Sequence, residues 1–88
     1  MKTLVILISG RGSNMQALLN ADLNVDRMVV ISNNPRAEGL QIAQQQGVET
    51  CVVDHRDFKD RQGFDEVLAE KLAEFQPKIV ALAGFMRI

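Results

Sequence analysis

A short apolar run that feeds into a glycine-rich turn constrains the fold of this chain more than any other stretch. Residues 4–8 are all apolar, the turn at residues 10–14 contains two glycines, and a helical pattern leaves it. Strand, glycine-rich turn and helix in this order form anion sites in α/β proteins, because the first N–H groups of a helix lack partners within the helix. The pattern predicts a phosphate site at the turn. The alternative is a tight turn in which Ser13 or Asn14 merely caps the helix.

The rest of the chain continues the alternation of strands and helices. Strands are predicted at 3–8, 28–31, 49–53 and 79–83, and helices at about 14–21, 35–46 and 61–76. The first and last strands are apolar without alternation, which is typical of strands covered on both faces of a parallel sheet. The connections are long enough for helical crossovers, and such crossovers are right-handed. The sequence therefore predicts an α/β, Rossmann-like, doubly wound parallel sheet with the order β-α-β-α-β-α-β and strand order 3-2-1-4.

Helix ends are marked by residues with specific backbone preferences. Asn34 and Pro35 predict a cap and first residue for the second helix, although a loop with a later helix start is the alternative. Gly47 predicts a left-handed stop for that helix. Asp60 predicts the cap of the third helix and Pro77 its end.

The predicted topology brings two distant stretches together. Ligands of doubly wound sheets bind outside the carboxyl ends of the strands, where the strand order reverses. This places residues 10–14 opposite residues 84–88. The last strand, 79–83, would lie at a free edge without a charge or proline to protect it, and such an edge favours pairing. We therefore expect the sheet to be truncated here and the chain to be the first part of a larger domain.

Composition argues against several functional classes. The 88 residues suffice for one modest core, and the net charge of −1 gives no argument for a nucleic-acid or membrane partner. The single cysteine, Cys51, cannot form an internal disulfide, which favours a cytoplasmic location. No His, Cys, Asp and Glu cluster has metal-ligand spacing, so no metal is expected.

The turn does not match two better-known phosphate motifs. In the dinucleotide motif G-x-G-x-x-G the third glycine is replaced by Met15, and residues 32–34 supply no acid to hold a ribose. No Gly-Lys-Ser/Thr sequence follows, which excludes a P-loop. Arg61 gives a further hint, because a cation in the first turn of a helix opposes the helix dipole. It predicts either an anionic partner or a solvated surface arginine.

Three stretches of the sequence, 5–16, 31–33 and 82–88, together resemble the phosphoribosylglycinamide formyltransferase family. The strings Ser-Gly-x-Gly-Ser-Asn and Ala-Gly-Phe-Met-Arg-Ile are specific when found together. The resemblance covers residues 1–88 and implies the amino-terminal, phosphate-binding portion of a single formyltransferase domain. It implies transfer of a formyl group from 10-formyltetrahydrofolate, a reduced-folate co-substrate, to the amine of glycinamide ribonucleotide in de novo purine synthesis.

The resemblance also assigns roles to particular residues. Those that would hold the ribonucleotide phosphate are Gly12, Ser13 and Asn14. Those that would bind the folate are Arg61, Met86, Arg87 and Ile88. Among these, Arg61 would meet a carboxylate of the folate's glutamate tail.

The family's catalytic residues have no counterpart in this chain. In the family mechanism the substrate amine attacks the formyl carbon, an Asn and a protonated His stabilise the oxyanion, and an Asp supports proton transfer. These residues lie beyond residue 88 in the family, so we expect the chain alone to be inactive. We also expect self-association, or pairing with the missing carboxyl half, through the fourth strand. Alternative functions are another folate-dependent formyl enzyme and a small phosphate- or nucleotide-binding module.

Overall fold

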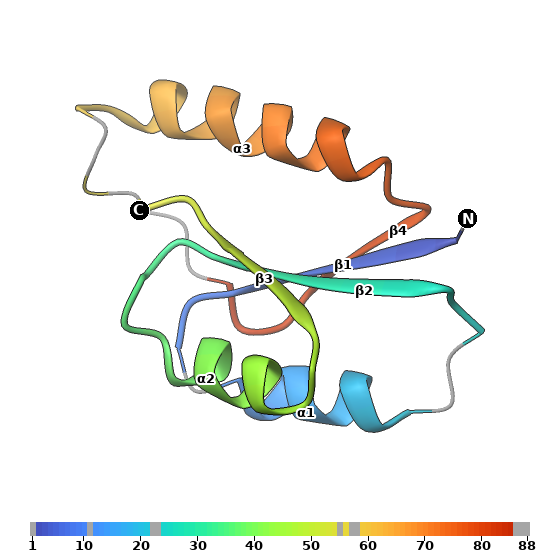
Figure 1. The fold of residues 1–88 in the computed structure, drawn as a ribbon. Coiled ribbons are helices and arrows are strands. Elements are labelled where there is room, and N and C mark those ends of the chain that lie inside the picture. Colours follow the sequence, from blue (N-terminus) through green and yellow to red (C-terminus); the bar gives the residue numbers. More distant parts are fainter. Residues whose placement is uncertain (1, 11, 22–23, 55, 57–58, 86–88) are drawn as a thin grey trace.

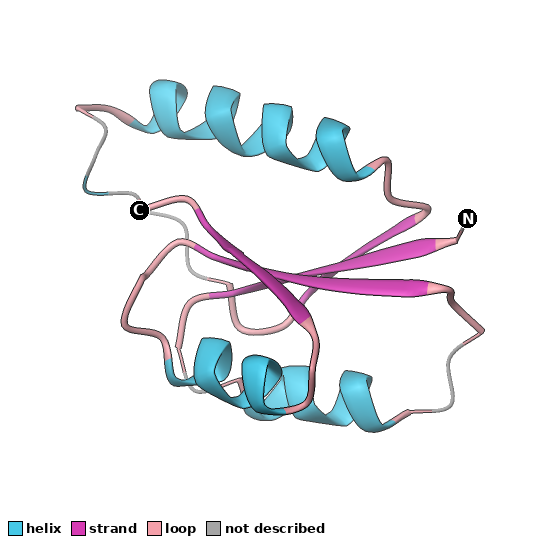
Figure 2. Ribbon diagram, viewed as in Figure 1, coloured by secondary structure: helices cyan, strands magenta, loops and turns pink. Residues whose placement is uncertain are grey.

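The computed structural model describes residues 2–10, 12–21, 24–54, 56 and 59–85 (Figures 1 and 2). Strands and helices alternate in the predicted order. The elements are β1 (Thr3–Ile8), α1 (Ser13–Asn20), β2 (Arg27–Ser32), α2 (Glu38–Gln45), β3 (Glu49–Val52), α3 (Arg61–Phe75) and β4 (Ile79–Leu82).

The four strands form one sheet in the order β3-β2-β1-β4, and every neighbouring pair is parallel. Val5 of β1 lies beside Val29 of β2 on one side and beside Val80 of β4 on the other. The strand order reverses between β1 and β4, so the predicted doubly wound topology is confirmed.

Helices cover both faces of the sheet, as Figure 1 shows: α3 lies on one face, and α1 and α2 lie on the other. Side chains of β1 alternate between the two layers. Leu4, Ile6 and Ile8 pack with the buried residues of α1 and α2, whereas Val5 and Leu7 pack with those of α3. Because both faces are buried, the strand is apolar without interruption.

The start of α2 differs from the predicted one. Asn34 does not cap a helix that begins at Pro35; the helix begins at Glu38, which is the later start that the sequence left open. Asn34 instead accepts a hydrogen bond at Oδ1 from the backbone N–H of Arg36 (3.0 Å). This side-chain turn competes with helical geometry, as is typical of asparagine.

The other signals predicted for the ends of α2 and α3 are confirmed. Gly47, just after α2, has a φ of 76°. Asp60 caps α3, with its Oδ1 accepting a hydrogen bond from the N–H of Gly63 at 2.9 Å. Helix α3 ends at Phe75, two residues before Pro77, and Gln76 takes a left-handed conformation there.

Strand β4 forms an exposed edge of the described sheet. It pairs with β1 on one side, and its side chains Ile79, Val80 and Leu82 are 51%, 43% and 70% exposed. Within the described residues, no helix has the length and apolar character needed to cross a membrane.

Candidate functional site

A pocket of about 200 Å³ opens at the carboxyl ends of β1 and β4. Its walls come from the turn after β1 and from the start of the segment after β4. The residues that line it are Ser9, Gly10, Gly12, Ser13, Asn14, Ala83 and Gly84. The predicted meeting of the two stretches is thus confirmed for the residues that the structure describes.

The amino end of α1 forms one wall of this pocket. Gly12 is the cap residue, with φ 78° and ψ 24°, and as a glycine it has no side chain that could make a capping hydrogen bond. The alternative that Ser13 or Asn14 caps the helix is therefore wrong: both are helical residues with exposed side chains. The carbonyl of Gly12 accepts the first helical hydrogen bond, from the N–H of Gln16 at 2.8 Å. The N–H groups before Gln16 carry the positive end of the helix dipole.

Helix α3 provides a contrast within the same molecule. Its amino end is closed by a side chain of the protein itself, the carboxylate of Asp60. Neither helix has an acidic residue in its first turn. Both amino ends therefore favour a negative charge. In α3 the carboxylate of Asp60 provides it, whereas at α1 an anionic ligand could do so.

The opposite wall follows β4. Ala83 is buried, and its N–H donates to the carbonyl of Leu7 in β1 (2.9 Å), which extends the pairing of the two strands by one residue. Gly84 then turns the chain with a φ of 75°. Phe85 is half-buried and packs against the apolar cluster beneath α3. This wall therefore combines backbone groups with an apolar anchor.

Some predicted site residues lie outside the described part of the chain. Met86, Arg87 and Ile88 follow the second wall but are not among the described residues. Arg61 is the first residue of α3, as the sequence predicted, and its side chain is also outside the description. Their roles in folate binding stay predictions.

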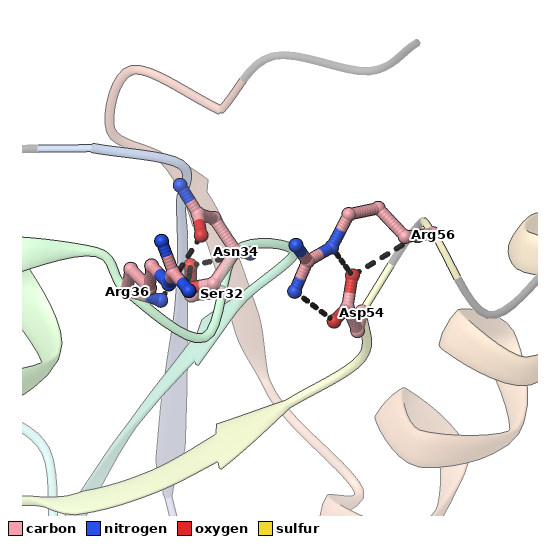
Figure 3. A network of polar contacts seen from close by, with 5 residues as sticks. All are labelled: Ser32, Asn34, Arg36, Asp54 and Arg56. Atoms are coloured by element: carbon pink, nitrogen blue, oxygen red, sulfur yellow. Dashed lines mark hydrogen bonds and ion pairs between the residues drawn. The ribbon is translucent and has the colours of Figure 1, made fainter.

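A polar network that the sequence did not predict lies at the carboxyl ends of β2 and β3 (Figure 3). The hydroxyl of Ser32 accepts from the N–H of Asn34 (3.0 Å) and donates to the carbonyl of the same residue (2.9 Å). Nearby, Arg56 forms an ion pair with Asp54 at 2.9 Å. The sequence Ser-Asn-Asn-Pro at residues 32–35 could have indicated the part of this network at Ser32 and Asn34, because serine and asparagine side chains favour local backbone hydrogen bonds over a helix.

The back of the glycine-rich turn is formed by residues that the sequence did not indicate as functional. A Cβ atom on Gly12 would lie 2.9 Å from Cα of Gly39 and 3.1 Å from Cε of Met15. The turn therefore lies between the pocket in front and a closely packed layer behind. Among the described residues no group of three or more His, Cys, Asp or Glu side chains could hold a metal ion.

Comparison with known proteins gives one consistent result. The family model described as Formyl transferase matches residues 2–88. Phosphoribosylglycinamide formyltransferase of Escherichia coli (strain K12) is 38% identical over 89 residues, which cover 97% of this chain and 42% of that protein. The human trifunctional purine biosynthetic protein adenosine-3 is 44% identical over 89 residues, covering 94% of this chain and 9% of that protein.

Solved structures agree with the sequence relatives. The phosphoribosylglycinamide formyltransferase of Coxiella burnetii aligns with a TM-score of 0.90 and 39% identity, covering 99% of this chain and 43% of that one. Glycinamide ribonucleotide transformylase 1 of Symbiobacterium toebii aligns with a TM-score of 0.90 and 37% identity, covering 100% and 43%. The chain thus spans less than half the length of each of these four relatives. The family model, sequence relatives and structures together show that the chain belongs to the formyl transferase family, among the phosphoribosylglycinamide formyltransferases.

Proposed function

We propose that this chain serves the transfer of a formyl group from 10-formyltetrahydrofolate to the amine of glycinamide ribonucleotide in de novo purine synthesis. Its part is to hold the ribonucleotide phosphate and one portion of the folate. The observation that carries the proposal is the amino end of α1, whose cap residue Gly12 has no side chain, in the pocket between β1 and β4. Family membership supplies the reaction class.

The phosphate binds at Gly12, Ser13 and Asn14. All three line the pocket. Because Gly12 has no side chain, a phosphate oxygen can approach the main chain closely, and the first N–H groups of α1 can donate to it. The side chains of Ser13 and Asn14 are exposed and add polar groups that can turn toward the same anion.

The folate lies along the second wall, beyond Gly84. The turn at Gly84 and the apolar anchor at Phe85 suit a flat, partly apolar ligand. In this proposal Met86, Arg87 and Ile88 continue the folate pocket, and Arg61 meets a carboxylate of the glutamate tail. When bound, 10-formyltetrahydrofolate supplies the formyl group; the residues of this chain only bind and orient it.

The chemistry requires a proton to leave the attacking amine, and the described pocket has no group for that role. None of its seven lining residues carries a titratable side chain. A general base must therefore come from outside this set. We propose that the chain alone is inactive and that the family's catalytic Asn, His and Asp are contributed by a carboxyl-terminal segment.

Strand β4 is the proposed surface for that segment, with self-association as the alternative use. Its exposed apolar side chains lie at the sheet edge, where backbone groups favour pairing with another strand. A second hollow, of about 240 Å³, lies beside it. Apolar residues of β1, β4 and α1 make up most of its lining, among them Leu4, Leu18 and Ile79.

The partners proposed are small molecules in the cytoplasm rather than nucleic acid or a membrane. A net charge of −1 provides no long-range attraction to polyanions. Cys51 is a free cysteine in β3, which suits a reducing compartment.

Titration calorimetry tests the binding part of the proposal. Glycinamide ribonucleotide should bind the folded chain, and glycinamide riboside, which lacks the phosphate, should bind at least about tenfold more weakly, as expected for the loss of one charged hydrogen bond or more. Equal affinity for the two compounds would refute the phosphate assignment. No binding of the ribonucleotide by the folded chain would refute the proposal that this chain holds the substrate phosphate.

A formyl-transfer assay tests the catalytic part. The chain alone should show no turnover, and adding the carboxyl-terminal half of a relative should restore some. Robust turnover by residues 1–88 alone would show that the catalytic group lies within this chain.

A further inference from the structure

The glycine-rich turn rests against the first turn of α2, and the point of contact is Gly39. This residue is buried and is not among those that line the pocket. Its N–H donates a hydrogen bond to the carbonyl oxygen of Gly10 (3.1 Å). A Cβ atom on Gly39 would lie 3.2 Å from Cα of Gly12 and 3.4 Å from the carbonyl oxygen of Gly10. The two backbones thus approach so closely that a methyl group on Gly39 would require the turn at Gly12 to shift by a few tenths of an ångström.

We propose that Gly39 is a positioning residue for the phosphate site, which fixes the backbone of the turn from behind. The inference rests on the proposed role of the turn as the phosphate site. A carbonyl of Gly10 that is held by Gly39 cannot rotate toward the pocket, where its negative end would repel an anion. Donors that are already in place also bind an anion without the cost of reorganisation.

The helix itself gives no reason for a glycine at this position. Glycine in a helix is less favourable than alanine, because it loses more backbone freedom on folding. A Cβ on Gly39 would clash with the core beneath, where it would lie 2.6 Å from Cδ1 of Ile8, a fully buried side chain. On the turn side it would make a tight contact of 3.2 Å with the backbone of Gly12. The close approach between α2 and the turn therefore accounts for the glycine.

The hydrogen bonds of Ser32 help to place Gly39 against the turn. Its hydroxyl holds both backbone groups of Asn34, and the carbonyl of Asn34 accepts from the N–H of Ala37 (3.1 Å). These contacts delay the start of α2 to Glu38, so that Gly39 falls in its first turn. The polar network of Figure 3 thereby sets the helix that supports the phosphate turn.

The test compares Gly39→Ala with Ala43→Gly, a matched control in the same helix. Ala43 is fully buried, so its replacement also destabilises α2, but one turn away from the contact with Gly12. Dissociation constants for inorganic phosphate and glycinamide ribonucleotide should rise at least about fivefold in Gly39→Ala, as expected when a charged hydrogen bond weakens. In Ala43→Gly they should change less than about twofold. Equal losses in the two variants would overturn the proposal.

Ligand-free spectra give a readout that does not depend on phosphate. The amide resonances of Gly10 and Gly12 should shift in Gly39→Ala and stay in place in Ala43→Gly. Unchanged resonances in Gly39→Ala would refute the positioning role even if binding changed. If the unaltered protein bound neither phosphate compound, the proposed function would fail, and these spectra would still decide whether Gly39 sets the turn.

A double variant separates the turn from the core. Ile8→Val removes the Cδ1 atom that a methyl group at position 39 would meet, while the 3.2 Å approach to Gly12 stays. Ile8→Val combined with Gly39→Ala should therefore regain thermal stability relative to Gly39→Ala and still bind phosphate weakly. Recovery of stability and affinity together would show that Gly39 acts only through core packing. This variant also keeps the test open if Gly39→Ala alone does not fold.

Discussion

Replacing Gly12 with alanine should destabilise the protein more than the same change at two other glycines. A non-glycine residue in the left-handed region costs about 1–2 kcal/mol, partly offset by about 0.4–1 kcal/mol from the less flexible unfolded chain. Gly12, at φ 78°, bears this cost. Its Cβ would also lie 2.9 Å from a backbone carbon of Gly39, and such overpacking adds about 1–3 kcal/mol. The total is a loss of about 2–4 kcal/mol.

Two control glycines separate the contributions. Gly47 has a φ of 76° but open space around its Cα, so Gly47→Ala should cost only about 0.5–1 kcal/mol. Gly10 has open space and no positive φ, so Gly10→Ala should change stability by at most about 1 kcal/mol and in the stabilising direction.

Urea denaturation followed by circular dichroism measures all three variants. The free energies of unfolding should fall in the order Gly10→Ala, Gly47→Ala, Gly12→Ala, with similar slopes against urea concentration. If Gly12→Ala lost no more stability than Gly47→Ala, the close approach of the turn to α2 would be disproved.

Three further predictions concern the rest of the fold. Asp60→Ala should cost about 0.5–2 kcal/mol of stability through loss of the α3 cap, measured by urea midpoint, whereas Asp60→Ser should retain most of it. Arg27 bonds both carboxylate oxygens of Glu49 (2.6 and 2.7 Å) and lies 5.2 Å from the ring centroid of Phe75. Because the charged side chains are 36% and 46% exposed, a double-mutant cycle between them should give a coupling of less than about 1 kcal/mol that weakens with salt; a larger, salt-independent value would contradict this. Leu82→Lys should reduce any self-association seen by analytical ultracentrifugation without lowering thermal stability, and unchanged association would exclude the β4 edge as the contact.

Much of the fold could be predicted because its signals are local or follow from general rules. The apolar run of β1 indicates burial on both faces, and the structure divides it between two layers, with Ile6 toward α1 and α2 and Val5 toward α3. The strand order followed from crossover handedness and from the usual topology of such sheets. The same topology placed the first turn opposite Gly84.

The features that could not be predicted depend on contacts between distant residues or on competing local hydrogen bonds. The sequence around Asn34 is compatible both with a helix cap and with a side-chain turn. The hydrogen bond from the N–H of Asn34 to the hydroxyl of Ser32 favours the turn. The support of Gly12 by Gly39 joins two helices, so no spacing in the sequence indicates it. Gly12, rather than Ser13, caps the start of α1 because the left-handed conformation at that point is less costly for glycine than for a residue with a side chain.

A titration with glycinamide ribonucleotide, followed by amide chemical shifts, tests most directly the proposal that the amino end of α1 binds the phosphate. The largest shifts should fall on Gly12, Ser13 and Asn14, and the amide of Gly63, which Asp60 already holds, should not move. Glycinamide riboside should leave the α1 amides nearly in place. Saturating binding that moves other parts of the molecule and leaves these three amides unchanged would contradict the account.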